Sequence, residues 1–394
     1  MWATIVFSSA LVVKQKLPNC LEETLSGAIT LVICGMNKEN DKEGHLHSVR
    51  NAACATLVGK LPMSPAAKYV SAHIFYNSAD LTPLLLQCVA PLLVDLRQNR
   101  AISRAFFIRY WLGGPHIRLR LLPASGVASA DISKAIEPII RQFFTRSPSP
   151  TDVDRKTYGP MMRQWFEAEY GRDAYLAQYG DSREIPIYPN NSLHYIDYEP
   201  EYAVYGGPEG VSLAEAHFDC SSSTVLDVLQ IAQGWSRAAM LSKAMEVMLH
   251  FVTAFYSTPD ESARFLRHYV ARWSTGTFFP ARDHWEPGFE RAYGQQSAAL
   301  REHVDRVLST EGSAESQQTY LFNNWQRHAR ELQREISALY LSNRLHFSHP
   351  ASQAAATNNL LAAYLHMTNN RLGLRISEEA YVAYLLARTL EDLG

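Results

Sequence analysis

The sequence predicts an α+β fold in which a first half rich in mixed or antiparallel sheet packs with a helical second half. Two observations carry this prediction. Between residues 71 and 122, segments that alternate apolar and polar side chains are bounded by turn residues, a pattern typical of strands. After Ser221 the apolar residues recur with helical spacing and strand signals end. Strands gathered in one part of a chain and helices in another favour α+β over alternating α/β folds.

The same patterns place the individual elements in chain order. Strands are expected at 71–77, 106–111 and 116–122, with further extended segments within 155–163 and 193–205. Helices of the first half are expected at 81–97 and 129–145. The second half is expected to form helices at 224–256, 262–273, 289–308, 319–342, 354–371 and 378–393.

The first 65 residues differ in composition from the rest of the chain. Six of the nine lysines lie before residue 70, and Asn37–Ser48 reads as a polar loop. Met1–Val13 is apolar and uncharged, but it lacks the basic start and the cleavage site of a signal peptide, so its alternation favours a strand. We therefore divide the chain into an N-terminal extension of unknown role, residues 1–65, and a main domain, residues 66–394.

Composition excludes several classes of protein. The 394 residues carry a net charge of −2 and are 47% hydrophobic, which argues against disorder and against a nucleic-acid binder that works through a basic field. No apolar run reaches the roughly 18 residues of a membrane helix, so no membrane span is expected. The five cysteines include no CxxC pair, which excludes a zinc ribbon and favours a reduced, cytoplasmic compartment. Cofactor and metal motifs are absent, so we expect no cofactor and no metal.

Arginine outnumbers lysine by 28 to 9 without a positive net charge, which indicates local use of arginine. The passage that concentrates it is residues 106–123, FFIRYWLGGPHIRLRLLP, which reads as a hairpin around a Gly-Gly-Pro turn. A four-residue turn at Leu112–Pro115 pairs Trp111 with His116, Arg109 with Arg118 and Phe107 with Arg120. This register predicts an apolar face and a polar face, the polar face carrying Arg109, His116, Arg118 and Arg120.

The polar face of this hairpin has two interpretations. Like charges directly opposite each other across a strand pair are destabilising, so the arrangement needs a reason. The arginines are either solvated or paired with acidic strands elsewhere in the fold, or they form a site for an anionic substrate. Fixed guanidinium groups bind carboxylates through two hydrogen bonds, which suits the second interpretation.

Residues 193–207, LHYIDYEPEYAVYGG, supply carboxylates. Continued alternation places Tyr195, Asp197, Glu199 and Glu201 on one side of an extended segment. These acids are either solvated or act on the arginines, and Glu201, shortly before the Gly-Gly turn, is the stronger candidate for acid–base work.

Residues 360–373, LLAAYLHMTNNRLG, read as a largely buried helix that ends at Gly373. His366 and Asn370 share one face at a spacing of four residues. A buried histidine is more often a core residue with its hydrogen bonds satisfied than a catalyst. It is also the side chain best suited to proton exchange near neutral pH.

Three of these passages, FFIRYWLGGPHIRLRLLP, YEPEYAVYGGPEG and LHMTNNRLG, occur in this order along the chain. Together they resemble the C-terminal domain of class I lantibiotic dehydratases, which also occurs alone as the thiopeptide-type bacteriocin biosynthesis protein. The resemblance extends over residues 71–393 and leaves residues 1–65 unexplained. In that family the domain eliminates glutamate from glutamylated Ser or Thr residues of a ribosomal precursor peptide, leaving dehydroalanine or dehydrobutyrine.

The resemblance implies that this chain is a carbon–oxygen lyase of lanthipeptide or thiopeptide antibiotic biosynthesis. Arg118 and Arg120 match the elimination arginines of the family, His366 matches its catalytic histidine and Glu201 its acid before the Gly-Gly turn. We expect further substrate contacts from Arg109, His116, Asn370 and Arg371. The implied partners are the glutamylated precursor peptide and a separate tRNA-dependent glutamylating dehydratase subunit, so the chain itself need not bind nucleic acid.

One position departs from the family pattern. Val204 stands directly before Tyr-Gly-Gly, where many elimination domains carry Arg. Two alternatives to elimination therefore stay open. Stand-alone relatives include pyridine synthases, which use the same scaffold for a formal 4+2 cycloaddition of two dehydroalanines followed by release of the leader peptide. The other alternative is a non-catalytic subunit that binds peptide for a glutamylating partner.

Overall fold

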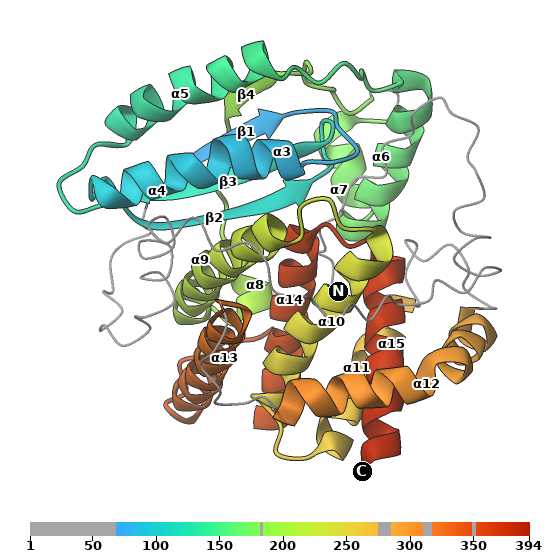
Figure 1. Cartoon of the computed structure of the whole chain (residues 1–394). Coiled ribbons are helices and arrows are strands. Elements are labelled where there is room, and N and C mark those ends of the chain that lie inside the picture. The colour runs from blue at the N-terminus through green and yellow to red at the C-terminus, as the bar shows by residue number, and fades with distance from the viewer. Residues whose placement is uncertain (1–67, 182–183, 275–284, 310–316, 349–351) are drawn as a thin grey trace. The chain divides into compact units, whose positions relative to one another are not determined.

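The computed structural model describes residues 68–181, 184–274, 285–309, 317–348 and 352–394, which divide into two compact units (Figure 1). The first unit contains residues 68–229 and 343–348. The second unit contains residues 230–342 and 352–394, apart from the gaps just given. The N-terminal extension of residues 1–65, with its expected strand and polar loop, lies outside the described residues.

The first unit is built on a four-stranded antiparallel sheet with strand order β2-β3-β1-β4. Its strands are β1 (Val70–Phe75), β2 (Ile102–Tyr110), β3 (His116–Pro123) and β4 (Ser192–Tyr195). The three strands expected between residues 71 and 122 are therefore confirmed, with ends shifted by a few residues. Polar and apolar side chains alternate along β1 and β3, so the sheet has an apolar face and a more polar face. Phe106, Ile108 and Tyr110 of β2 lie on the more polar face, opposite Arg120, Arg118 and His116.

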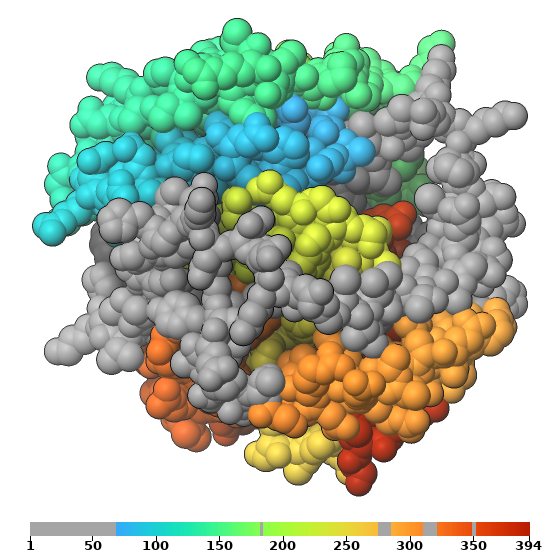
Figure 2. All heavy atoms as spheres, viewed as in Figure 1, coloured from blue at the N-terminus to red at the C-terminus, as the bar shows by residue number. Residues whose placement is uncertain are grey.

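Helices cover the apolar face of the sheet. The segment α3 (Thr82–Leu84), η2 (Leu85–Val89) and α4 (Ala90–Gln98) is helical throughout, and α4 contacts β2. Helix α5 (Ser129–Arg146) contacts β1 and β4, and the Tyr195 hydroxyl donates to the Ser133 carbonyl of α5 at 3.3 Å. The buried side of α5 carries an isoleucine every fourth residue, while its other side lies at the surface (Figure 2). Both expected helices are thus confirmed.

The first half contains more helix and less sheet than expected. Residues 155–163, expected to be extended, form the start of α6 (Arg155–Tyr170), which is followed by α7 (Arg172–Tyr179). Asp154 is the N-cap of α6, because its side chain accepts a hydrogen bond from the Lys156 backbone N–H at 3.2 Å. The buried residues of α6, Tyr158, Met162 and Phe166, recur every four residues. Pro160, which lies inside α6 beyond its first turn, masked this periodicity in the sequence.

The segment after β4 also departs from the expected extended structure. The chain forms the short helix α8 (Tyr202–Tyr205) and then the long helix α9 (Pro208–Ile231), which begins well before Ser221. Helix α9 closes the outer edge of β2, because the Asp219 carboxylate and the Ser222 hydroxyl accept the backbone N–H groups of Ala105 and Phe107, both at 3.1 Å. An edge strand satisfied in this way does not pair with another chain.

In the described residues of the second unit, all regular secondary structure is helical. Its helices are α10 (Arg237–Thr253), α11 (Pro259–Ser274), α12 (Trp285–Ser309), α13 (Gln317–Leu341), α14 (Gln353–Leu372) and α15 (Ile376–Leu393). They confirm the helical second half, except that the expected helix 224–256 is broken at Gly234, which has a φ of 76°. No helix in the described part of the chain has the length and apolarity needed to cross a membrane.

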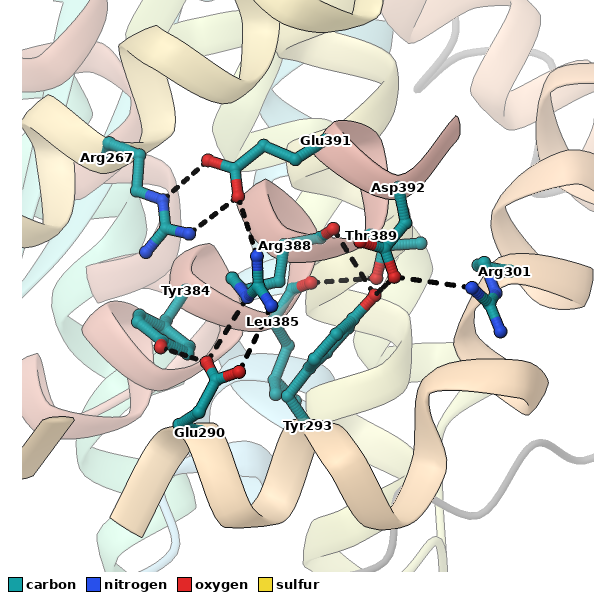
Figure 3. A network of polar contacts seen from close by, with 10 residues as sticks. All are labelled: Arg267, Glu290, Tyr293, Arg301, Tyr384, Leu385, Arg388, Thr389, Glu391 and Asp392. Carbon is teal, nitrogen blue, oxygen red and sulfur yellow. Dashed lines mark hydrogen bonds and ion pairs between the residues drawn. The ribbon is translucent and has the colours of Figure 1, made fainter. Parts of the chain in front are cut away.

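Polar contacts fasten the last turns of α15 to α11 and α12 (Figure 3). Arg267 of α11 donates to both carboxylate oxygens of Glu391, at 2.7 and 2.6 Å. Arg388 of α15 donates to both oxygens of Glu290 of α12, at 3.2 and 3.1 Å. Each pair is part-exposed and contributes little alone, but two bidentate pairs sharing a helix fix its position.

Two of the five cysteines lie in the described residues. Cys88 is a buried free thiol, and burial raises its pKa to about 12. Cys220 is buried in α9.

Candidate functional site

The pairing of β2 with β3 differs by one residue from the expected hairpin register. Tyr110 lies opposite His116, Ile108 opposite Arg118 and Phe106 opposite Arg120. The turn therefore contains five residues, because Trp111 leaves the ladder and its carbonyl accepts from the Gly114 N–H at 3.0 Å and from the Tyr158 hydroxyl at 2.9 Å.

This shift moves Arg109 to the other side of the sheet. Side chains alternate along a strand, so a slip of one residue exchanges the faces of a whole segment. Arg109 lies opposite Ile117 and is buried on the apolar face, away from Arg118 and Arg120. The predicted grouping of Arg109 with Arg118, Arg120 and His116 is therefore wrong for Arg109.

The polar face brings together side chains from three strands. Arg120 lies opposite Ser71, Arg118 opposite His73, and His194 lies opposite His73 on its other side. We call this surface the arginine–histidine face, and define it as Ser71, His73, His116, Arg118, Arg120 and His194. The contributions of Ser71 and His73 were missed from the sequence, although alternation along β1 places them on one face.

Each arginine of this face is held by neutral groups and aromatic rings. Arg120 donates to the Ser71 hydroxyl and to Nε2 of His73, the latter at 3.3 Å, and its guanidinium lies 4.7 Å from the Tyr198 ring centre. Arg118 donates from Nε to Nε2 of His116 at 3.4 Å and stacks 3.3 Å from the Tyr110 ring centre. Stacking orients a guanidinium while leaving most of its N–H groups available.

Burial keeps the histidines of this face neutral. Burial, with the charges of the arginines, lowers the pKa of His73 and of His116 well below the usual value. His116 lies 2.8 Å from the Gly114 carbonyl through Nδ1, so Nδ1 carries the proton and Nε2 accepts from Arg118. Burial and the charge of Arg118 lower the pKa of Arg120 to about 9, so Arg120 stays charged at neutral pH.

Glu201 lies close enough to this face to act on it electrostatically. Its charge raises the pKa values of Tyr110 and Arg120, which are otherwise set mainly by burial. Within the described residues, neither Arg118 nor Arg120 forms an ion pair with a carboxylate. The expected alternation from Tyr195 to Glu201 is wrong, because β4 ends at Tyr195 and Glu201 directly precedes α8.

The Gly-Gly turn after Glu201 is fixed by close packing. Gly206 and Gly207 have φ values of 80° and 93°, and Val204 is half-buried just before them. The His346 backbone N–H donates to the Gly206 carbonyl at 2.7 Å, and a Cβ on Gly206 would lie 2.8 Å from the Phe347 ring. Glycine is required here because both the conformation and the packing exclude a side chain.

His366 lies in the second unit and contacts an acid that the sequence did not reveal. Its Nδ1 lies 3.0 Å from Oε2 of Glu379, which also accepts from the Tyr269 hydroxyl at 2.7 Å. The Trp273 ring stacks on the imidazole at 4.4 Å. Glu379 and His366 are on different helices, so no local spacing connects them.

Asn370 and Arg371, expected to contact substrate, are buried in α14. Arg371 donates to the Met367 carbonyl at 2.9 Å, and the Asn370 carbonyl accepts from the Gly373 N–H at 3.0 Å. These contacts belong to the helix and its end. In the described residues, no group of three or more His, Cys, Asp or Glu side chains is placed to hold a metal ion.

Comparisons with known proteins agree with this architecture. Residues 70–390 match the family model described as lantibiotic biosynthesis dehydratase C-term. The chain belongs to this family. No protein with a curated description matches the chain significantly.

Three solved structures share the fold. The pyridine synthase TbtD from thiomuracin biosynthesis is 21% identical with a TM-score of 0.66, and the match covers 83% of this chain and 98% of TbtD. TsrL is 15% identical with a TM-score of 0.57, covering 82% of this chain and 95% of TsrL. The tRNA-dependent lantibiotic dehydratase MibB from Microbispora sp. 107891 is 17% identical with a TM-score of 0.51, covering 84% of this chain and 28% of MibB.

Proposed function

We propose that this chain is a carbon–oxygen lyase that eliminates glutamate from glutamylated Ser or Thr residues of a ribosomal precursor peptide. The products are glutamate and a peptide that contains dehydroalanine or dehydrobutyrine. A separate tRNA-dependent enzyme would supply the glutamyl ester, and both would act in the cytoplasm. Membership of the lantibiotic dehydratase C-terminal family supports this proposal.

The observation that carries the proposal is the pair Arg118 and Arg120. Both guanidinium groups stand on one side of β3, held by histidine, serine and aromatic rings, and neither has a carboxylate ion pair in the described residues. A buried cation without a counter-ion is costly, and an arriving anion offsets that cost. A surface that is arranged in advance for negative charge suits a reaction in which a carboxylate leaves.

The reaction assigns a task to each residue. A base removes the α-proton of the glutamylated residue, the Cα–H electron pair forms the Cα=Cβ bond, and the Cβ–O bond breaks so that glutamate leaves as a carboxylate. We assign the leaving carboxylate and the enolate-like charge to Arg118 and Arg120. The charge of Glu201 favours the protonated form of Arg120, because it raises the pKa of that guanidinium against the effect of burial. His366 is assigned proton transfer, as the family resemblance implies.

A second candidate function is pyridine formation from two dehydroalanines. Val204 favours it, because the arginine common in elimination domains is missing from that position. The similarity in fold also spans 98% of a stand-alone pyridine synthase but 28% of a complete dehydratase. A polar face with two arginines and neutral histidines would then polarise a peptide carbonyl instead of holding a free carboxylate.

Two mass-spectrometric assays distinguish these functions. Given a precursor peptide that the glutamylating enzyme has esterified, the chain is expected to remove each glutamyl group and leave one dehydro residue. Glutamyl peptide that persists while the partner enzyme is demonstrably active contradicts elimination. Given a peptide with two dehydroalanines, a macrocyclic product with released leader supports the synthase. A peptide that binds but stays unchanged in both assays supports a non-catalytic subunit.

A further inference from the structure

Three helices of the second unit meet around one buried carboxylate. Tyr269 and Trp273 come from α11, His366 from α14 and Glu379 from the first turn of α15. Glu379 is 1% exposed, and His366 is 3% exposed. The tyrosine hydroxyl and the imidazole both contact Oε2 of Glu379, at 2.7 and 3.0 Å. In this geometry a carboxylate orients the imidazole of His366 through a contact with Nδ1, and Nε2 is the nitrogen on the other side of the ring.

The hydrogen bonds determine where the imidazole proton resides. Burial first, and then the charge of Glu379, raises the pKa of Tyr269 well above its usual value, so Tyr269 remains a hydroxyl that donates. A carboxylate can only accept, so Nδ1 of His366 must carry a proton toward Glu379. A neutral His366 therefore has its lone pair on Nε2. The Trp273 ring, stacked at 27° to the imidazole, restrains rotation about the side chain.

The basic side chains around Glu379 in the described residues, other than His366, pair with other groups. In the described residues, the only basic side chain in an ion-pair contact with Glu379 is His366. The guanidinium of Arg272, on α11, lies 5.7 Å from the Trp273 ring centre. Its charge opposes the rise in the pKa of Tyr269 that burial causes, and it makes no ion pair with Glu379. The neighbouring Glu378 is bound instead by Arg237 and Arg375. Two adjacent glutamates on α15 therefore have separate tasks.

The position of Glu379 is rigidly defined. Glu378 anchors the first turn of α15 through Arg237, and the contacts of Arg267 and Arg388 anchor its last turns (Figure 3). A group that orients a catalytic histidine must sit on such a fixed element, because small displacements reduce the rate of proton transfer.

We propose that Glu379 is a positioning residue that holds His366 as the Nδ1–H tautomer and so presents Nε2 for proton transfer. This inference rests on the role of His366 in the proposed function. A carboxylate behind a catalytic imidazole both fixes the tautomer and stabilises the imidazolium that forms when Nε2 takes a proton. Glutamine at position 379 has nearly the same shape but can donate to Nδ1, which favours the opposite tautomer.

The test combines a tautomer measurement with kinetics. In wild-type protein labelled with ¹⁵N-histidine, the nitrogen chemical shifts of His366 are expected to show a protonated Nδ1. In Glu379→Gln they are expected to show a protonated Nε2, with kcat for glutamate release reduced on the order of 10²–10⁴-fold and KM nearly unchanged. Tyr269→Phe retains the carboxylate, so His366 keeps its tautomer and loses at most about tenfold in kcat.

Glu378→Gln is the matched control, since it changes a neighbouring buried glutamate on the same helix. It is expected to lower stability and to leave the tautomer of His366 unchanged. If His366→Ala abolishes elimination while Glu379→Gln keeps both tautomer and kcat, the inference is wrong and the proposed function stands. If Glu379→Gln exchanges the tautomer but neither variant affects elimination, the role of His366 in the proposed function is wrong and the positioning inference fails with it.

Discussion

Arg118 lies directly opposite Ile108 across the β2–β3 ladder, one residue away from the arginine-to-arginine pairing that the sequence favoured. The pairing of two arginines is thereby avoided, which removes the repulsion that such a register would carry. The charge on the polar face still remains high, because Arg118 and Arg120 share it with no ion-paired carboxylate in the described residues. This arrangement is the reason for proposing that the face binds an anion.

Free glutamate, the product of elimination, is expected to bind this face. Replacing Arg120 by Lys removes the planar guanidinium and its paired hydrogen bonds, so the Kd for glutamate is expected to rise about 10–100-fold. Isothermal titration calorimetry measures the change. Arg141→Lys, at an exposed ion pair on α5, is the control and should bind as wild type does. Equal affinities in the two variants would remove the arginines from carboxylate binding.

The neutral histidines of the same face predict a loss of stability in mild acid. Burial lowers the pKa of His73 in the folded state, so below the ordinary value of 6.5 only the unfolded chain gains its proton. The stabilisation is complete above pH 6.5 and is lost as the pH falls. His73→Gln is therefore expected to weaken the decline of the unfolding free energy between pH 7 and 5.5 by about 1.2 kcal/mol. Urea titrations of both proteins at the two pH values test this, and identical declines would contradict it.

Glu378 also stabilises the fold less as the pH falls, but over a more acidic range than His73 does. Burial raises its pKa, but hydrogen bonds and charges from Arg237 and Arg375 outweigh burial and lower the pKa to about 2. These contacts therefore stabilise the fold above pH 4.5, and the stabilisation disappears as the pH falls toward 2. Both arginines are exposed by more than 40%, which weakens the contacts, so Glu378→Gln is expected to lower the unfolding free energy at pH 7 by about 1–3 kcal/mol. A deficit of the same size at pH 3 would show that the charge is not responsible.

The turn after Glu201 depends on Gly206. Alanine there combines a φ of 80° with a Cβ placed 2.8 Å from the Phe347 ring, so Gly206→Ala is expected to lower stability by about 1–3 kcal/mol. Gly126→Ala is the matched control, because Gly126 has a φ of 82° and open space around it. Thermal unfolding of the two variants separates the packing effect from the conformational effect. If both lose the same stability, Phe347 does not restrict the turn.

The sequence predicted the strands and helices better than the relations between them. Alternation identified β1, β2 and β3, and the spacing of apolar residues identified α10 to α15. The register of the hairpin was missed by one residue, because nothing local shows whether Trp111 ends the ladder or pairs within it. Helix α6 was missed because Pro160 interrupts its pattern.

The candidate site was predictable where it lies along one strand. Arg118, Arg120 and His116 share a face of β3 by alternation alone, so their grouping is confirmed by the structure. The pair of His366 and Glu379 joins two helices, and the two adjacent glutamates of α15 give no sign of which one faces the histidine. Such pairs depend on how helices pack, which residue spacing does not specify.

The proposed role of the arginine–histidine face is to drive loss of glutamate from an esterified peptide. The single-turnover rate of glutamate release from a glutamylated precursor peptide, compared between wild type and Arg118→Ala, tests this role. We expect release by wild type, and a rate reduced on the order of 10²–10³-fold in the variant, with the fold retained. Release at the wild-type rate by a folded Arg118→Ala protein would show that this face does not drive elimination.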